Sequence, residues 1–479
     1  MDRSILSNAD FPAVDRGQWL ELVARSLGKD TDYESLIRHT DDGIPVEPLY
    51  ERSSNPSPLA RRDPASPWKL IQRMDDPDPV RANAQAREDL AQGAQGLSLV
   101  FAGAPNAFRY GLPSNPEVLE TALADLPLKD IHLRIDVHPQ SRASVDWLVD
   151  ILTKKRADPA RLNLSFGIDP ASLFAGTGRL RMSIEALEAS MPPSLAGYFA
   201  LSLPGILLEA DGRVFHNAGA TEAQELGIML ASAVAHLRMF EEARQPLVYA
   251  VPHIGFALSV DQDQFLSMAK IRALRKLWAR MLEACSIGPS PATVHAETSY
   301  RMMTARDPET NILRTTIAAF AAACGGADSI SVLPHTITHG LPDGFARRLA
   351  RNAQLILAGE SRLDFVADPA AASGAIEALT DSLCEKAWEE FRQIEKEGGV
   401  LRSLAHGHIQ SRIDAARARR LAEFREGNRN IVGTTLYKLA QERPFTTLSA
   451  ERQPIPTDGA VACIPLAAAR IDEGLGEPA

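Results

Sequence analysis

Short apolar runs alternate with stretches of helical periodicity from residue 96 onward, and this alternation constrains the fold more than any other feature of the chain. Each run is apolar or β-branched in its centre and ends in Gly, Asp, His, Ser or Pro. This pattern is typical of buried parallel strands that end in functional loops. The runs are GLSLVFAG (96–103), IHLRIDVH (131–138), LNLSFGID (162–169), YFALSLPG (198–205), GRVFHNAG (212–219), LVYAVPHIG (247–255), ATVHAETS (292–299) and SISVLP (329–334).

Helical stretches of suitable length lie between most of these runs. Apolar residues recur at spacings of three and four in 221–243 and in 263–285. The stretch 308–326 opens with a proline and closes on two glycines, as helices often do. Residues 205–212 join two runs without a helix. Eight strands with mostly helical crossovers predict an α/β fold, a (β/α)8 or TIM barrel, over residues 95–360.

The segments that flank this predicted barrel are extended or helical. Residues 1–94 predict an N-terminal arm, with an amphipathic helix in GQWLELVARSLGK and an extended stretch in HTDDGIPVEPLY. Residues 361–425 are charged and strongly helical. Residues 426–479 are rich in turn-forming residues and predict a C-terminal linker or surface arm. The sequence therefore predicts a barrel with an N-terminal arm and a C-terminal helical segment.

The composition argues against several classes of protein. The chain has 479 residues and a formal net charge of −10, which does not suit a nucleic-acid-binding surface. No apolar run has the length of a membrane span and the N-terminus has no signal-peptide pattern, so no membrane partner is expected. The four cysteines are far apart and form no CxxC pair, which indicates a reduced, cytoplasmic protein without a zinc cage or disulfide framework.

Several polar residues fall where the predicted strands end. In a barrel enzyme the catalytic groups lie at the carboxyl ends of the strands, so each of these residues is a candidate. They are Asp136, Asp169, His253, Glu297, Ser299 and His335. His216 lies in the run 212–219, between apolar residues and a turn of small residues, and is a weak catalytic candidate.

Three further motifs have an ordinary structural explanation. His335 and His339 are four residues apart, but the flanking VLP and GLP favour a loop and no third ligand is near, so no metal site is predicted. The segment DVHPQS (136–141) has a serine where a cobalamin-ligating Asp-x-His-x-x-Gly motif has glycine, and it predicts a polar strand end. The basic stretch RALRKLWAR (272–280) predicts a solvated or interface face of a helix.

Long segments of the chain resemble, in the right order, the methylmalonyl-CoA mutase family. In the second half these are AKIRALRKLWARMLEA, HAETSYRMMTARDPETNILRTTIAAFAAACGGADSISVLPH, LPDGFARRLARNAQLIL, VADPAAASGAIEALTDSLCEKAWEEFRQIEKEGG and GNRNIVGTTLY. Upstream, TDDGIPVEPLY, WKLIQRMDDPDPVRANAQAREDLAQGAQGLSLVFAGAP and HNAGATEAQELG are more similar to the small subunit of the heterodimeric mutases than to the catalytic chain. The resemblance covers about residues 20–440 and implies a barrel of the type that serves CoA-ester carbon-skeleton mutases.

The resemblance also implies where the cofactor belongs. Catalytic chains of the family usually continue into a flavodoxin-like cobalamin domain or use a separate cobalamin subunit. The residues after the predicted helical segment, 426–479, are too few for such a domain. Adenosylcobalamin is therefore expected on a partner chain, the large catalytic subunit of a heterodimer, and no cofactor is expected on this chain.

The family's substrate-contacting residues have no counterpart at the matching positions. A tyrosine beside the substrate radical matches Arg73 in PWKLIQR. The tyrosine and histidine of the family's Gly-Tyr-His-Met-Gln-Glu-Ala-Gly-Ala motif match Arg213 and Val214, and the carboxylate-binding arginine falls near Thr177 or Gly178. A carboxylate in a dry cavity needs a bidentate cation, and a polarised carbonyl needs an aimed donor. The resemblance therefore implies that this chain has no catalytic residues.

These observations predict the small, non-catalytic subunit of a heterodimeric methylmalonyl-CoA mutase of propionate metabolism, which stabilises the catalytic chain. Whether the isolated chain is an enzyme stays open. One alternative is a catalytic acyl-CoA mutase subunit that uses a separate cobalamin-binding protein. The other is a scaffold or chaperone for a mutase.

Whether His216 can replace the family's histidine depends on the expected strand at residues 212–219. In a strand, His216 would face the same way as Val214 but lie about 6–7 Å further along, too far to replace the family's histidine. A two-residue deletion would align His216 with that histidine, but the register of a strand resists such a slip. The sequence therefore predicts that this segment marks a lost active site.

Overall fold

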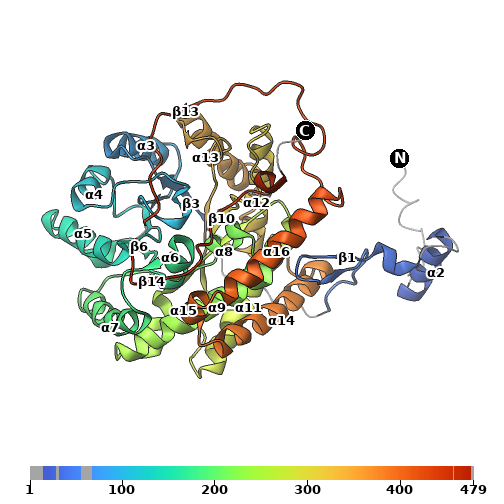
Figure 1. The fold of residues 1–479 in the computed structure, drawn as a ribbon, viewed down its shortest axis with the longest axis horizontal. Helices are drawn as coiled ribbons and strands as arrows, with labels where there is room; N and C mark the ends of the chain where they lie inside the picture. The colour runs from blue at the N-terminus through green and yellow to red at the C-terminus, as the bar shows by residue number, and fades with distance from the viewer. Residues whose placement is uncertain (1–14, 28–31, 55–66, 457, 476–479) are drawn as a thin grey trace, which may run out of the picture.

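The computed structural model describes residues 15–27, 32–54, 67–456 and 458–475, and at its centre eight parallel strands form a ring surrounded by helices (Figure 1). The strands are β3 (Lys69–Met74), β4 (Gly96–Leu99), β5 (His132–Ile135), β6 (Asn163–Phe166), β8 (Leu208–Asp211), β9 (Ile254–Val260), β10 (Thr293–Thr298) and β11 (Ser329–Ser331). Their order is β6-β5-β4-β3-β11-β10-β9-β8, and a parallel bridge between Ser165 and Ile206 joins the two edges. The predicted (β/α)8 barrel is confirmed.

Helices connect these strands and cover the outside of the ring (Figure 1). They are α3 (Pro79–Ala91), α4 (Pro116–Ala122), α5 (Ser141–Lys154), α6 (Pro170–Thr177), α7 (Ile184–Ala200), α8 (Arg213–Ala218), α9 (Glu222–Glu242), α10 (Leu247–Ala250), α11 (Gln264–Ala284), α12 (Thr310–Gly325) and α13 (Gly344–Gly359). The C-terminal helical segment contains α14 (Gly374–Lys396), α15 (Val400–Ala405) and α16 (His408–Arg425). Short antiparallel ladders join β1 (Arg38–His39) to β2 (Pro45–Val46), β7 (Arg179–Leu180) to β14 (Val461–Ala462), and β12 (Leu341–Pro342) to β13 (Thr447–Leu448).

Local sequence signals fix the ends of several helices. The Thr221 hydroxyl accepts a hydrogen bond from the backbone N–H of Gln224, whose side chain accepts one from the Thr221 N–H, and this capping box starts α9. The Asp263 carboxylate caps α11 at the N–H of Leu266, 3.1 Å away. At the end of α12, Gly326 has a φ of +88°, a left-handed conformation that favours glycine.

The apolar core lies between the ring and its helices. Outward-facing strand residues such as Leu97 and Leu99 of β4 are buried against this layer. Phe256 of β9 meets Trp278 of α11 edge to face, with 5.1 Å between the ring centroids. Burying a side chain of this size contributes about 1.5–3 kcal/mol, so the helices are held on the ring mainly by these contacts.

The structure corrects parts of the strand assignment. Residues 198–205 end helix α7 and continue into a loop, and residues 212–219 contain helix α8 in place of a strand. The ring instead uses β8, which ends just before α8, and β3, which lies in the segment 1–94 expected to be an arm. The run 247–255 contains α10 and only the start of β9.

Burial explains these errors. All six residues of α8 are buried, and its polar residues Arg213, His216 and Asn217 bond to other parts of the chain, so the helix lacks the usual solvent-exposed polar face. In β3 and β8, charged residues stand at alternate positions, as in KLIQRM and LEAD. Their side chains point into a polar barrel interior, and a search for apolar runs passes over such strands.

The basic stretch of α11 packs inside the chain. Arg272 is fully buried and pairs with Asp368 and, at 2.6 Å, with Glu377 of α14. One turn further on, Lys276 pairs with Asp381 of α14 at 2.6 Å. Part of this basic stretch is therefore an interface within the chain that attaches the C-terminal helical segment to the barrel, while Arg280 at its end is exposed to solvent.

The segment after α16 crosses the carboxyl face of the barrel (Figure 1, red). The backbone N–H of Gln453 donates to the carbonyl of Arg109, beyond β4, at 2.7 Å. Further along, β14 pairs with β7, and the N–H of Ala469 donates to the carbonyl of Asn217 in α8 at 3.0 Å. This segment, residues 447–475 without residue 457, thus lies over the loops where the strands end.

The N-terminal arm touches the rest of the chain mainly through its extended part. Helix α2 (Arg16–Leu27) has no buried residue and lies apart from the ring (Figure 1). Asp41 pairs with Arg420 of α16 at 2.6 Å and with Arg429. Within the described ranges, none of the helices combines the length and the apolar character that crossing a membrane requires.

Candidate functional site

Charged and polar side chains line the interior of the barrel, where such barrels usually hold branched apolar residues. Side chains alternate along a strand, and contacts across the ring identify the inward set. Arg134 of β5 and Glu209 of β8, for example, meet as a bidentate ion pair. The inward-facing residues include Lys69, Arg73, Ser98, His132, Arg134, Asn163, Ser165, Glu209, Asp211, Thr293, His295, Glu297, Ser329 and Ser331.

Arg73 fills one side of the interior near the carboxyl ends of the strands. Its guanidinium donates to Glu297 at 2.8 Å, to Asp75 at 3.2 Å and to the carbonyl of Asn106 at 2.7 Å. Arg347 of α13 donates to the other oxygen of Asp75 at 2.5 Å. Burial alone would raise the pKa of Asp75, but Arg347 and Arg73 lower it to about 2. Arg73 is thus committed to the chain's own acceptors.

Arg213, the first residue of α8, fills the other side. It donates to Asp211 at 2.7 Å through Nη2 and at 2.9 Å through Nε, to Glu297 at 3.4 Å, and to both oxygens of Asp136. All four side chains are almost completely buried. Against the effect of burial, Arg213 and Arg134 hold the pKa of Asp136 well below its ordinary value.

These pairs form one connected set, which we call the barrel ion network. It comprises Arg73, Arg134, Arg213, Arg347, Asp75, Asp136, Glu209, Asp211 and Glu297. Five carboxylates face four guanidinium groups, so one carboxylate is in excess. Burial, together with Asp136 and Glu209, raises the pKa of Asp211 to about 7 although Arg213 opposes this. The excess charge is therefore relieved by a proton on Asp211 as the pH falls towards neutrality.

The network separates the mouth of the barrel from a cavity at its amino end. This cavity has a volume of about 660 Å³ and is lined by residues at the starts of the strands, among them Lys69, His132 and His295. Burial lowers the pKa of His132 to about 4, and the neighbouring cation Lys69 acts in the same direction. The interior is thus hollow at the amino ends of the strands, whereas near their carboxyl ends it is filled by ion pairs.

The other positions singled out by the sequence resemblance carry no free polar group aimed into the barrel. Val214 lies in an apolar cluster with Phe174 and Phe215. The Thr177 hydroxyl donates to the carbonyl of Leu173 at 2.7 Å, and Gly178 ends α6 in a left-handed conformation. Arg73 and Arg213 are held in the network.

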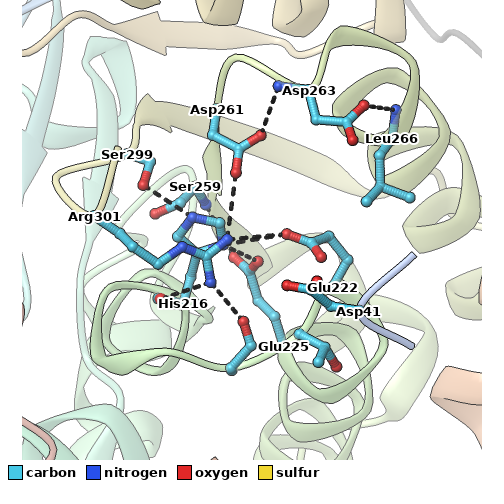
Figure 2. Close-up of polar contacts among 12 residues, drawn as sticks. Asp41, His216, Glu222, Glu225, Ser259, Asp261, Asp263, Leu266, Ser299 and Arg301 are labelled. Carbon is cyan, nitrogen blue, oxygen red and sulfur yellow. Dashed lines mark hydrogen bonds and ion pairs between the residues drawn. The ribbon is translucent and has the colours of Figure 1, made fainter. Parts of the chain in front are cut away.

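His216 stands between the carboxylate of Glu225 and the hydroxyl of Ser299 (Figure 2). Its Nδ1 lies 3.0 Å from Glu225 and its Nε2 lies 2.9 Å from the hydroxyl of Ser299. Burial holds the pKa of His216 well below its ordinary value, and the cations Arg301 and Lys270 act in the same direction. The ring is therefore neutral, so Nδ1–H donates to Glu225 and Nε2 accepts from Ser299.

This order of hydroxyl, imidazole and carboxylate is the one that activates a serine nucleophile. Two observations argue against that use. Lys270 donates to Glu225 at 2.7 Å and neutralises the carboxylate. Ser299 and His216 have no exposed surface, so no substrate reaches the hydroxyl. The arrangement joins α8, α9, α11 and the end of β10.

Arg301 gathers acidic residues beside His216 (Figure 2). It donates to Glu222 at 3.2 Å, to Asp261 at 3.3 Å and to the carbonyl of Ala220 at 2.6 Å. Burial and the nearby Asp261 raise the pKa of Asp263 to about 6. Over the described part of the chain, no three His, Cys, Asp or Glu side chains are grouped so that they could hold a metal ion.

The strand-end candidates are not brought into one site. Asp136 and Glu297 join the network, but Asp169 caps α6 and accepts the backbone N–H of Asp211 at 2.9 Å. The prediction for His253 is wrong, because this residue precedes β9 and lies at the amino end of the ring, where its Nδ1 donates to the carbonyl of Gly205 at 2.7 Å. His335 lies in the loop after β11.

The paired histidine motif is a loop, as expected. His335 and His339 lie in consecutive turns, and the Nε2 of His339 donates to the carbonyl of Ala305 at 2.7 Å.

Five of the nine residues of the barrel ion network were not candidates from the sequence: Asp75, Arg134, Glu209, Asp211 and Arg347. Arg134, Glu209 and Asp211 nevertheless carry a signal, because each is a charged residue at an inward-facing position of a short strand. This alternation of charged and apolar residues is the signal that could have found them, because a charge between apolar neighbours in a buried strand must face a polar interior. Their partners lie far away in the sequence, as Arg134 and Glu209 do, 75 residues apart.

Comparison with known proteins identifies the family. The sequence profile described as methylmalonyl-CoA mutase matches residues 114–458. The chain belongs to the methylmalonyl-CoA mutase family. It is 35% identical over 470 residues to the methylmalonyl-CoA mutase small subunit of Streptomyces virginiae, and the match covers 94% of this chain and 73% of that protein.

Two other relatives show how the chain stands within the family. It is 30% identical over 479 residues to the methylmalonyl-CoA mutase small subunit of Propionibacterium freudenreichii subsp. shermanii, with 93% and 71% of the two chains covered. It is 27% identical over 465 residues to the methylmalonyl-CoA mutase of Escherichia coli, with 89% and 64% covered. The family and the small-subunit type expected from the sequence are thereby confirmed.

Proposed function

We propose that this chain is the small, non-catalytic subunit of a heterodimeric, adenosylcobalamin-dependent methylmalonyl-CoA mutase in the cytoplasm. The large subunit binds the cofactor and interconverts (R)-methylmalonyl-CoA and succinyl-CoA. The small subunit stabilises it through a permanent interface, of the kind that commonly buries more than about 2,000 Å².

The barrel ion network is the observation that carries the non-catalytic role. A carboxylate substrate in this interior would need a cation, and the cations Arg73 and Arg213 are already bound to buried carboxylates of the chain. Separating one partner from a buried ion pair typically costs about 3–5 kcal/mol. At the position of the family's histidine, Val214 offers no donor to a thioester carbonyl. The interior therefore favours its own ion pairs over a substrate.

The residues at the barrel mouth do not fit a cobalamin. The segment 447–475 lies over that face and is hydrogen-bonded to the loops below, as at Gln453 and Ala469. In the cobalamin-like segment DVHPQS, His138 is fully buried beneath the surface, stacked on Phe101 at a centroid distance of 4.5 Å. Its Nε2 is bonded to the hydroxyl of Ser144. No catalytic step is therefore placed on this chain.

Co-expression with the cognate large subunit tests the proposal. We expect a stable equimolar complex on size-exclusion chromatography, mutase activity in the complex, and a longer lifetime of the large subunit at 37 °C when this chain is present. Purified alone and given adenosylcobalamin, this chain should not turn over methylmalonyl-CoA. Turnover by the isolated chain, or with an added cobalamin-binding protein, would instead establish a catalytic acyl-CoA mutase subunit. A complex that dissociates on the column while still protecting the mutase would establish a scaffold or chaperone.

A further inference from the structure

A cavity outside the barrel takes no part in the proposed function. It has a volume of about 820 Å³ and lies between helices α5, α6 and α7, with Pro456 and Asp458 of the C-terminal segment at its edge. Small-molecule sites in proteins usually have volumes of about 300–1,000 Å³. Its walls are mainly apolar and contain Ile168, Leu173, Leu180, Met182, Leu187 and Met191. A flexible apolar chain would fit such a wall, because methionine side chains adapt to irregular partners.

A cation without a carboxylate partner lies in the wall of this cavity. Arg142, in the first turn of α5, reaches across to α7 and donates to the hydroxyls of Ser190 at 2.9 Å and Ser194 at 2.8 Å. A third bond goes to the carbonyl of Ser190 at 3.3 Å. These acceptors are all neutral, and no carboxylate of the described residues pairs with this guanidinium. The bonds to α7 hold the guanidinium in place while its charge stays available to an anion.

The acidic residues around the cavity leave this charge in place. Asp169 is engaged as the cap of α6, and Asp458 pairs with Arg181 at 3.7 Å. Asp146 lies one turn after Arg142 on α5 and is exposed at the rim, where solvent screens its charge. Among the described residues, the hydrogen-bond acceptors of Arg142 are therefore neutral groups of α7.

His138 supplies a second, independent observation. It lines the cavity and has no exposed surface. The Ser144 hydroxyl donates its proton to the carbonyl of Ser141 at 2.7 Å, so it must accept the Nε2–H of His138, 3.1 Å away. Nδ1 of this neutral ring is then a hydrogen-bond acceptor, and it has no partner. A buried acceptor of this kind normally has a partner, and a local movement of the cavity wall would bring this one within reach of a polar group in the cavity.

We propose that this cavity binds an amphiphile, with its apolar chain against the leucine and methionine wall and its carboxylate or phosphate head on Arg142. The site is separate from the barrel interior, so its occupation does not depend on the proposed mutase role.

Isothermal titration calorimetry of the full chain with three ten-carbon probes tests this inference. Decanoate and decyl phosphate carry the anionic head, and decanol carries the same chain without charge. We expect one saturable site, with affinity for the better anion at least about tenfold above that for decanol, as a charge-assisted hydrogen bond provides. The order of the two anions shows whether the head group is a carboxylate or a phosphate. Equal affinity for decanol, or no saturable binding of any probe, overturns the proposal.

Two variants and a matched control place the binding in this cavity. Gly197 lies on α7 in the cavity wall, and a Cβ built there meets no atom within 4 Å, so Gly197→Leu adds a bulky apolar side chain to the wall without a clash at Cβ. Gly359→Leu at the end of α13 meets no atom either and is the control. We expect Gly197→Leu to abolish anion binding, Gly359→Leu to leave it unchanged, and Arg142→Gln to reduce the anions to the affinity of decanol. Unchanged binding in Gly197→Leu or Arg142→Gln refutes the assignment.

Discussion

Replacing Arg213 with methionine would remove a cation that three buried carboxylates share. Arg213 has no exposed surface and donates to Asp136, Asp211 and Glu297. Methionine is unbranched and of similar length, so it fills most of the space without supplying a charge or a donor. The perturbation therefore acts on the electrostatics of the barrel ion network more than on its packing.

The remaining contacts show which carboxylate would lose its only cation. Glu297 keeps its 2.8 Å bond to Arg73, and Asp136 keeps Arg134 at 3.6 Å. Asp211 loses its cation and keeps only weaker partners, such as the amide of Asn106 at 3.3 Å. Breaking a buried ion pair by removing one partner typically costs about 3–5 kcal/mol, and we expect a loss of unfolding free energy of that size at pH 8.

The loss should depend on pH. Without Arg213, the folded state raises the pKa of Asp211 further above its unfolded value, so the folded chain binds a proton that the unfolded chain lacks. Stability then increases as the pH falls towards the unfolded pKa, and the gap between Arg213→Met and the wild type narrows between pH 8 and pH 5.

Urea unfolding, followed by tryptophan fluorescence and far-ultraviolet circular dichroism, measures the effect. The control is Arg280→Met, which removes an exposed pair with Glu283 and should change the unfolding free energy by less than about 1 kcal/mol. Adding Asp211→Asn to Arg213→Met should restore part of the loss, because the amide removes the unpaired charge. A variant at Arg213 that is no less stable than Arg280→Met, or a gap that widens towards pH 5, would refute this account of the network.

Three further outcomes follow from the geometry. In the wild type, the raised pKa of Asp211, about 7, should make stability decline as the pH rises from about 4 to 7, and Asp211→Asn should remove that part of the decline in urea titrations. Arg73→Tyr, which restores the family's tyrosine, should give no turnover with adenosylcobalamin and should lower the thermal midpoint, since Glu297 loses its 2.8 Å ion pair and keeps only the longer contact with Arg213 at 3.4 Å. Activity in that variant would contradict the non-catalytic assignment. A Cβ on Gly205, whose φ is +75°, would lie 1.9 Å from the carbonyl oxygen of Leu164, where the ring closes. In urea unfolding, Gly205→Ala should therefore lower the free energy of unfolding by about 1–3 kcal/mol or more, while Gly288→Ala, whose added Cβ meets no atom within 4 Å, should lower it far less. Equal losses in the two variants would argue against backbone strain at the closure of the ring.

The sequence predicts most of the architecture because local signals carry it. The caps at Thr221 and Asp263 and the glycines after α12 mark helices that the structure contains. Strands with apolar centres, such as β4 and β10, are found for the same reason, whereas the predicted run 247–255 reaches only the beginning of β9. A strand whose inward-facing residues are charged, such as β3 or β8, is not recognised from the sequence, because its pattern indicates a strand only if the barrel interior is known to be polar.

The site was predictable only in part, and for a related reason. Arg73 and Arg213 stand out because a family motif places other residues there. Their partners are set by closure of the ring, which brings Arg73 within 2.8 Å of Glu297 although 224 residues separate them. Similarly, Lys270 and Glu225 pair across two helices, and neither position carries a local signal of its partner. Pairing of this kind becomes visible only in three dimensions.

The barrel ion network contains one more carboxylate than guanidinium groups, so the barrel interior cannot lose a cation without a loss of stability. Replacing Arg213 leaves Asp211 without a cation, and replacing Arg73 leaves Glu297 and Asp75 with one cation each, so either single exchange lowers stability. A chain of this type can recover a working interior only by changing a cation and its carboxylate together. The stability of the fold therefore restricts which single substitutions the barrel interior can accept.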